Sequence, residues 1–272
     1  MIDPSTLWPL ALALLAAGLI AGTIAGLLGV GGGILVVPLL DFVLQRAGVP
    51  VESSMHVAVA TSLATIIPTS IASARTHYRR EAIDFGLARD WAPGVIGGGL
   101  LGGLISAQAP EELLTAVFGA VAALVAVKMW LPLDHLRWRE TVPRGVVGNA
   151  LAGGIGAMSA LVGIGGGTLA IPTLTLCGVT IHRAIGTAAL FGLFLSSAGT
   201  LGYLLVRPDL PLPPYTWGLV NLLALALIAP AATLTAPFGA RLAHTLDRRR
   251  LSKIFGVFLL LVALRMLYRT LA

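Results

Sequence analysis

Glycine occurs in two clusters whose backbone N–H groups could bind an anion. Residues 25–40 read AGLLGVGGGILVVPLL and residues 159–174 read SALVGIGGGTLAIPTL, so the glycines and the following proline recur 134 positions apart. Glycine costs roughly 1 kcal/mol per residue inside a helix. Each cluster therefore predicts that one helix ends and a second begins. The start of a helix carries unpaired N–H groups and a partial positive charge, which suit an oxyanion.

Hydroxyl side chains near the clusters complete the predicted substrate site. Thr61, Ser62 and Thr187 follow the glycines along the chain, and their hydroxyls could donate hydrogen bonds to anion oxygens. Bonding to a carbonyl one turn earlier is the alternative role in a membrane helix. For the glycines, the alternative is a close crossing of two helices. The glycine positions of the predicted site are Gly29, Gly31, Gly32, Gly33, Gly163, Gly165, Gly166 and Gly167.

Few other polar side chains accompany the glycine clusters. His56 and His182 occupy matching positions at the starts of the following helices, where a histidine near an anion path could carry a coupled proton. A polar helix-end role without transport is the alternative. Asn149 and Asp41 stand inside the glycine-containing apolar segments and are functional candidates for that reason. We expect Asp41 at the membrane interface, because Arg46 follows closely.

The amino-acid composition indicates that these residues are held in a polytopic membrane protein. The 272 residues are 57% apolar and 11% charged, with a mean hydropathy of +0.91, far from the values of soluble domains. The net charge of +6 resides in short loops beside apolar segments, which fits the positive-inside rule rather than nucleic-acid binding. The single cysteine, Cys177, excludes an intramolecular disulfide. No cofactor, metal site or cleaved signal peptide is predicted.

Two of the eight apolar segments are too long for a single membrane crossing. About 20 apolar residues cross a hydrocarbon core that is about 30 Å thick. The two long segments contain the glycine clusters, so each predicts a helical hairpin that enters and leaves the membrane on one side. The segments span residues 7–44, 54–77, 86–108, 112–131, 144–178, 184–206, 215–240 and 251–268.

The chain also divides into two similar halves, residues 1–135 and 136–272. Several positions of the first half recur 137 positions later, including Pro93 as Pro230 and Lys128 as Arg265. The changes in spacing place insertions and deletions in loops, where they are tolerated.

The charged loops indicate that the two halves are inverted. With both hairpins returning to their own side, 14 of the 18 Lys and Arg residues face the cytoplasm and both termini lie outside. Eight plain spans divide the basic residues less sharply. The remaining four are Arg46, Arg207, Arg265 and Arg269. The predicted fold is an all-α polytopic membrane protein of two inverted repeats, each with a glycine-broken helical hairpin and three spanning helices.

These features resemble the sulfite exporter TauE/SafE family of membrane transporters. The resemblance rests on the paired G-x-G-G-G motifs with their prolines, on A-x-x-T-S-L at residues 58–63, and on Tyr78-Arg79-Arg80 followed by Asp84. It covers nearly the whole chain. It implies transport of a small anion, often sulfite, a sulfonate or thiosulfate.

Signatures of soluble and metal-dependent enzymes are missing from the sequence. The glycine clusters lack the G-x-G-x-x-G spacing and the Lys-Ser/Thr of a P-loop, and neither H-E-x-x-H nor G-x-S-x-G occurs. A membrane enzyme acting on a lipid phosphate needs acid–base carboxylates in the apolar segments, and we place the glutamates in loops. That enzyme and a passive anion channel are the alternatives to a transporter.

The predicted function is therefore alternating-access transport, with export as the expected direction. The expected setting is the bacterial inner membrane with the basic loops in the cytoplasm. The substrate and the lipid bilayer are the expected partners, whereas nucleic acid is not. A coupling proton or sodium ion and a second copy of the chain are further candidate partners.

Overall fold

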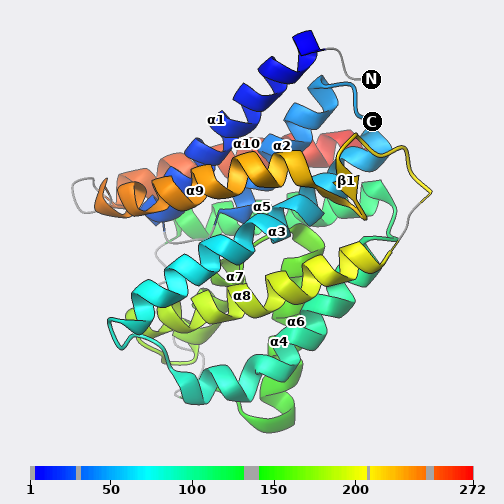
Figure 1. Cartoon of the computed structure of the whole chain (residues 1–272). Coiled ribbons are helices and arrows are strands. Elements are labelled where there is room, and N and C mark those ends of the chain that lie inside the picture. Colours follow the sequence, from blue (N-terminus) through cyan, green and yellow to red (C-terminus); the bar gives the residue numbers. More distant parts are fainter. Residues whose placement is uncertain (1–3, 29–31, 132–140, 207–208, 243–247, 272) are drawn as a thin grey trace.

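The computed structural model describes residues 4–28, 32–131, 141–206, 209–242 and 248–271, and these are almost entirely helical (Figure 1). The boundary predicted between the two halves lies outside the described residues. The helices of the first half are α1 (Pro4–Leu28), α2 (Gly33–Arg46), α3 (Val51–Tyr78), α4 (Phe85–Ser106) and α5 (Glu111–Trp130). Those of the second half are α6 (Gly145–Val162), α7 (Gly166–Leu176), α8 (Ile181–Leu205), α9 (Leu222–Leu242) and α10 (Arg248–Leu271).

The all-α polytopic membrane fold predicted from the sequence is confirmed. In the described part of the chain, seven helices are long and apolar enough to cross a membrane, namely α1, α3, α5, α6, α8, α9 and α10. Helix α4 has 22 residues, but Arg89, Asp90 and its many glycines make it less apolar. Each glycine cluster lies between two helices, as predicted. Each pair has a long first arm, α1 or α6, and a short second arm, α2 with 14 residues or α7 with 11.

One predicted segment, residues 215–240, does not begin as a helix. Its first residues form a two-stranded antiparallel hairpin of β1 (Thr216–Trp217) and β2 (Val220–Asn221) before α9 starts. The backbone φ of Gly218 is +57°, which glycine adopts at little cost in a tight turn. Apolar composition alone did not distinguish this short hairpin from a helix.

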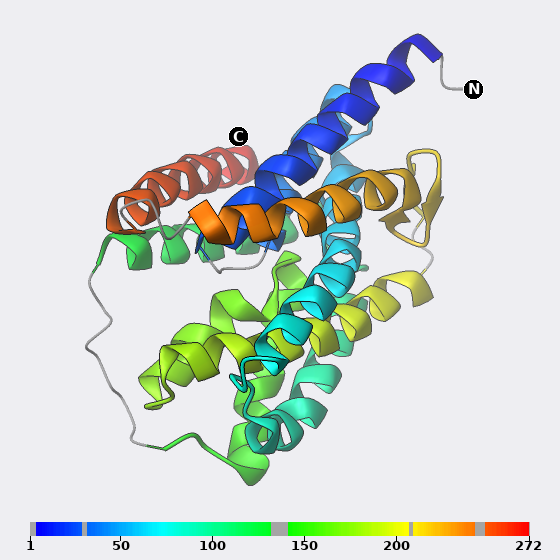
Figure 2. The same ribbon diagram turned by 60° about the vertical axis from the view of Figure 1, so that its left-hand side comes forward.

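Close glycine contacts join the two halves along two helix pairs, α4 with α6 and α1 with α9 (Figure 2). A Cβ added at Gly102 would lie 2.5 Å from the carbonyl oxygen of Ala157. Likewise, a Cβ at Gly239 would collide with the carbonyl oxygen of Thr23. Gly239 is the repeat counterpart of Gly102, and Ala157 is that of Thr23. The same contact between the two halves therefore occurs twice, with the halves exchanged.

The side chain of Asn149 in α6 forms hydrogen bonds with the backbone of α4 near Pro93. The Asn149 Oδ1 accepts a hydrogen bond from Gly94 N at 2.9 Å, and its Nδ2 donates to the carbonyl oxygen of Asp90 at 2.9 Å. In an unbroken helix these two backbone groups would bond to each other. Because a proline opens the helical bonding at this turn, the amide satisfies both groups. Asn149 therefore links α6 to α4.

Candidate functional site

The second glycine cluster breaks the helix by an identifiable backbone change. Helix α6 ends at Val162, and Gly163 has φ +70° and ψ +26°, the left-handed conformation that often terminates a helix. Gly165 is extended, and α7 begins at Gly166. In the first cluster α2 begins at Gly33, with Gly32 accepting hydrogen bonds from the N–H groups of the first turn. Gly29 and Gly31 lie outside the described residues.

The two breaks meet inside the bundle. A Cβ at Gly33 would lie 2.5 Å from the carbonyl oxygen of Gly163 and 3.0 Å from Cα of Ile164. The Ser62 hydroxyl donates to the Gly163 carbonyl at 2.8 Å and lies 3.4 Å from the Gly33 carbonyl. Ser62 thus binds both breaks to α3, and its hydroxyl is engaged with backbone.

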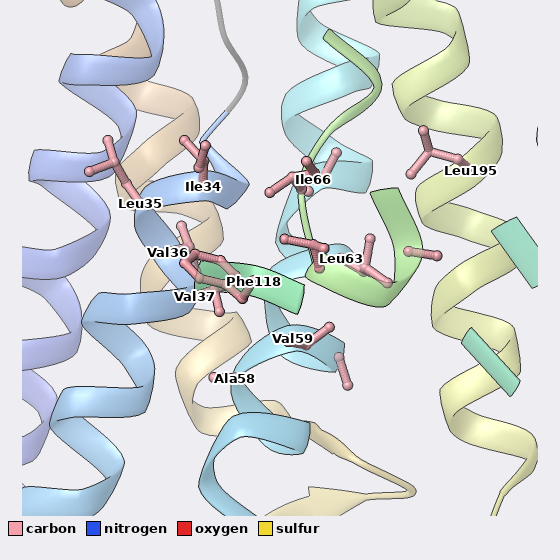
Figure 3. Close-up of a cluster of buried hydrophobic side chains, with 14 of the residues drawn as sticks. Ile34, Leu35, Val36, Val37, Ala58, Val59, Leu63, Ile66, Phe118 and Leu195 are labelled. Atoms are coloured by element: carbon pink, nitrogen blue, oxygen red, sulfur yellow. The ribbon is translucent and has the colours of Figure 1, made fainter. Parts of the chain in front are cut away.

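Apolar side chains surround this meeting point. Figure 3 shows Ile34 of α2 facing Ile66 of α3, with Leu63 and Val59 below them. All four side chains are buried. Non-helical backbone at membrane depth requires such cover by protein or by a water-filled cavity. The N–H groups of Gly33 and Ile34 in α2, and of Gly166 and Gly167 in α7, precede the first hydrogen bonds of their helices, so they are the groups that could hold an anion here.

Glycines that correspond in sequence differ in the space around them. Among the described residues, a Cβ added at Gly32 meets nothing closer than Cβ of Ala25 at 3.7 Å. At its counterpart Gly166, an added Cβ would lie 2.7 Å from the backbone nitrogen of Gly192. Gly166 is thus needed for the contact between α7 and α8, whereas Gly32 has room beside it.

Thr61 and Thr187 each accept a hydrogen bond at the start of another helix. The Thr61 hydroxyl accepts from Asn221 N at 2.9 Å, and the Thr187 hydroxyl accepts from Asp84 N at 3.0 Å. Asp84 and Asn221 are N-cap residues whose side chains accept from backbone N–H groups three positions later. These threonines therefore position the starts of α4 and α9.

The two histidines are not brought together. His56 is buried, with Nε2 2.9 Å from the carbonyl oxygen of Ala109 and Nδ1 3.1 Å from that of Glu52. His182 is exposed in the first turn of α8, next to Arg183. His56 lies at the end of the bundle that contains the α4–α5 connection, which we call the α4–α5 end. His182 lies at the end where α3 is connected to α4.

Asp41 is buried within the protein. It is 0% exposed, and its position at the membrane interface stays a prediction. Its Oδ1 accepts from Ser54 at 2.7 Å and from Gln45 at 2.8 Å, and its Oδ2 lies 3.0 Å from Nη1 of Arg269. A carboxylate inside the protein needs such partners, because an unpaired buried charge is strongly destabilising.

The same arginine pairs with a second carboxylate, Glu111, in the first turn of α5 rather than in a loop. Arg269 also donates to the Thr115 hydroxyl at 3.1 Å, and Thr115 donates to Glu111. Two carboxylates thus share one guanidinium, an arrangement that the sequence did not predict. The sequence did contain one sign of this polar cluster. Asp41 and Gln45 are four residues apart, which places both side chains on one face of the helix.

Two cavities are present in the described structure. A cavity of about 520 Å³ lies at the α4–α5 end, and its lining includes the acidic residues Glu52, Glu111, Glu112 and Asp209. A groove of about 440 Å³ runs beside the second hairpin, between α5, α6 and α7. Its lining includes Lys128, Thr168, Leu169, Pro172 and Thr173.

The fold and this arrangement of broken helices define the class of protein, a polytopic α-helical membrane transporter, and comparison with known proteins agrees. The family model of the sulfite exporter TauE/SafE matches residues 14–266. The chain belongs to this family.

Relatives in other organisms carry the same class of name. A probable membrane transporter protein of Haemophilus influenzae is 34% identical, over 92% of this chain and 95% of the relative. One from Xylella fastidiosa is 30% identical over 93% of both chains. The probable membrane transporter protein YunE of Bacillus subtilis is 25% identical over 92% of this chain and 95% of the relative. No solved structure matched the chain.

Proposed function

We propose that this protein is a secondary transporter that exports a small anion, sulfite or another sulfur-containing anion such as an organosulfonate, by alternating access. The observation that carries the proposal is the meeting of the two helix breaks, where Gly33 approaches Gly163. Secondary transporters place substrate sites at such broken helices, with the helix N-termini directed at anionic groups. The family's description as a sulfite exporter supports the choice of substrate.

The proposed substrate site is made by backbone N–H groups at the starts of α2 and α7, around Gly32, Gly33, Gly166 and Gly167. Backbone donors and the partial positive charge of a helix start can hold an oxyanion without a buried arginine. The hydroxyls of Thr61, Ser62 and Thr187 support this site indirectly, because they hold the hairpin tips and the starts of α4 and α9 in place.

The halves 1–135 and 136–272 act as inverted repeats in this proposal. Two observations support the relation. The contact of Gly102 with Ala157 recurs as the contact of Gly239 with Thr23, as a two-fold relation between the halves requires. Gln108 and Asp209 line the same cavity, whereas eight plain spans would put them on opposite faces. In this proposal the cavity faces the outside and the basic loops face the cytoplasm of a bacterial-type cell, which the distribution of basic residues supports.

A panel of ligands tests the proposed substrate class. Purified protein should bind sulfite, thiosulfate or a sulfonate at least about tenfold more tightly than a neutral sulfone of similar size, because only the anion is attracted by the helix N-termini. Sulfate and a carboxylate belong in the same panel. Calorimetry or ligand-induced shifts in thermal stability would measure the affinities. If no anion in the panel binds, the substrate proposal is wrong.

Flux measurements distinguish transport from passive conduction. In proteoliposomes the anion should accumulate against its own gradient when a proton or sodium gradient is imposed, and the effective ion identifies the coupling. A flux that only ever runs down the anion gradient would identify a channel of the same fold.

Cysteine labelling tests the topology. In a Cys177→Ala background, an impermeant thiol reagent added outside should label Gln108→Cys and Asp209→Cys but not Asp247→Cys. The expectation follows from the basic residues near Asp247 and from the cavity that Gln108 and Asp209 share. Labelling of Gln108→Cys and Asp209→Cys from opposite faces would restore the plain eight-span arrangement.

A further inference from the structure

The two hairpins correspond in sequence, yet their short arms are packed differently. In α2 every residue from Gly33 to Pro38 is buried, and so are Leu40, Asp41 and Leu44. In α7 fewer residues are buried, namely Gly166, Thr168, Ala170 and Leu174. The two halves are therefore not in the same conformation.

Half-buried residues of α7 border the 440 Å³ groove described above. Leu169 and Pro172 line this groove. Their repeat counterparts in α2 are Leu35 and Pro38, which are buried. Leu35 lies on the side of α2 away from Leu63 and Ile66 (Figure 3). The equivalent groove beside the first hairpin is thus closed at these positions.

Four residues hold α2 to α10 on the closed side. Asp41 pairs with Arg269 at 3.0 Å, and the guanidinium carbon of Arg265 lies 5.2 Å from the centre of the Phe42 ring. Arg269 extends the contact to α5 through Glu111. We call Asp41, Phe42, Arg265 and Arg269 the latch.

The second half cannot form the same ion pair. The repeat counterparts of Asp41 and Arg269 are Thr175 and Pro132, and that of Phe42 is Leu176. Only the position of Arg265 keeps a cation, as Lys128. The side that carries the Asp41–Arg269 ion pair is closed, and the side that lacks this pair has the open groove.

We propose that the latch keeps the groove beside α2 closed while the groove beside α7 is open, and that these two grooves are the alternating access paths of the transporter. The inference rests on the proposed transport function. The physical basis is the environment of the pair, since Asp41 is 0% exposed and the Arg269 side chain 20% exposed, and the attraction of opposite charges is stronger where water is largely excluded. Opening the groove admits water, which solvates both charges and lets α2 separate from α10. In the closed state Asp41 and Arg269 are therefore paired with each other, and in the open state both charges are solvated by water.

Accessibility of matched cysteines tests the latch in the full-length protein. In a Cys177→Ala background, a hydrophilic maleimide should label Leu169→Cys readily and Leu35→Cys at most about one tenth as fast. Adding Asp41→Asn should raise the labelling rate of Leu35→Cys about tenfold and lower that of Leu169→Cys, because the two grooves alternate. The change should preserve folding, since Arg269 keeps Glu111 as its counterion.

A second variant and a control keep the test sharp. Arg265 is exposed, so Arg265→Gln should fold normally and raise labelling of Leu35→Cys by about two- to threefold through loss of the contact with Phe42. Glu112→Gln removes an exposed charge beside Glu111 and should change neither rate. Thermal melting and monodispersity are measured for every variant.

Two results would overturn the latch. One is a folded Asp41→Asn protein in which Leu35→Cys stays protected. The other is a groove in which Leu169→Cys reacts only with a lipid-soluble maleimide, since the space would then hold lipid. The labelling uses no substrate, so it is separable from the proposed function. If Asp41→Asn opens the groove but the protein neither binds nor transports an anion, the transport proposal is wrong and the latch is still supported.

Discussion

Gly32→Val should abolish anion transport and leave the protein folded. The backbone of Gly32 has φ −64° and ψ −20°, which any residue adopts, and the nearest described atom to an added Cβ is 3.7 Å away. The valine side chain would stand beside the first N–H groups of α2. Loss of one or two hydrogen bonds to a charged ligand costs about 1.5–3 kcal/mol each, so affinity should fall at least about tenfold.

The measurement is anion affinity and flux per folded molecule, after thermal stability has been compared with that of the parent. Gly97→Val is the matched control, because Gly97 lies in α4 and a Cβ there has no described neighbour within 4 Å. A folded Gly32→Val protein that binds the anion as the parent does would show that the start of α2 is not the site.

Gly166→Val is not an equivalent probe, although Gly166 is the counterpart of Gly32. Its side chain would press on the backbone of Gly192 in α8, where an added Cβ has only 2.7 Å. Loss of transport in this variant would therefore report damaged packing as well as any damage to the site.

Gly98→Leu should prevent the protein from folding. An added Cβ at Gly98 collides with the carbonyl oxygen of Gly153, where α4 crosses α6 backbone against backbone. Rigid backbone cannot yield as a side chain can, so the helices must separate and lose the contacts between the two halves. We expect a destabilisation of about 3 kcal/mol or more.

The adjacent residue provides the control for this prediction. Gly97→Leu faces open space and should change the free energy of unfolding by no more than about 0.5 kcal/mol. The stability of both variants is measured by the yield of monodisperse protein and by the midpoint of thermal unfolding. A Gly98→Leu protein as stable as Gly97→Leu would contradict the close crossing of α4 and α6.

Local features of the fold were readable from the sequence because they depend on neighbouring residues. Four glycines in five positions interrupt a helix wherever they occur, and the structure ends α6 at Val162 and starts α7 at Gly166 accordingly. The lengths of the apolar segments likewise predicted the membrane helices, because each must satisfy its own backbone in lipid. The β-hairpin before α9 was missed, since each strand has only two residues, too few to show the alternation of a strand.

What the polar residues do was decided only by the tertiary structure. Thr61 and Thr187 turned out to accept from the N-caps of other helices, and Asp41 to meet an arginine 228 positions away in the chain. Gly32 and Gly166 stand in identical motifs, yet one has room and the other touches α8.

The physical reason lies in the membrane. In a soluble protein the periodicity of apolar residues identifies the buried face of a helix. Here lipid and protein interior are both apolar, so residues on either face look alike in the sequence, and the faces that pack together are set by close fit and by polar contacts between distant segments. The sequence therefore determined where each helix begins, ends and breaks, while only the folded chain determined which of its faces meet.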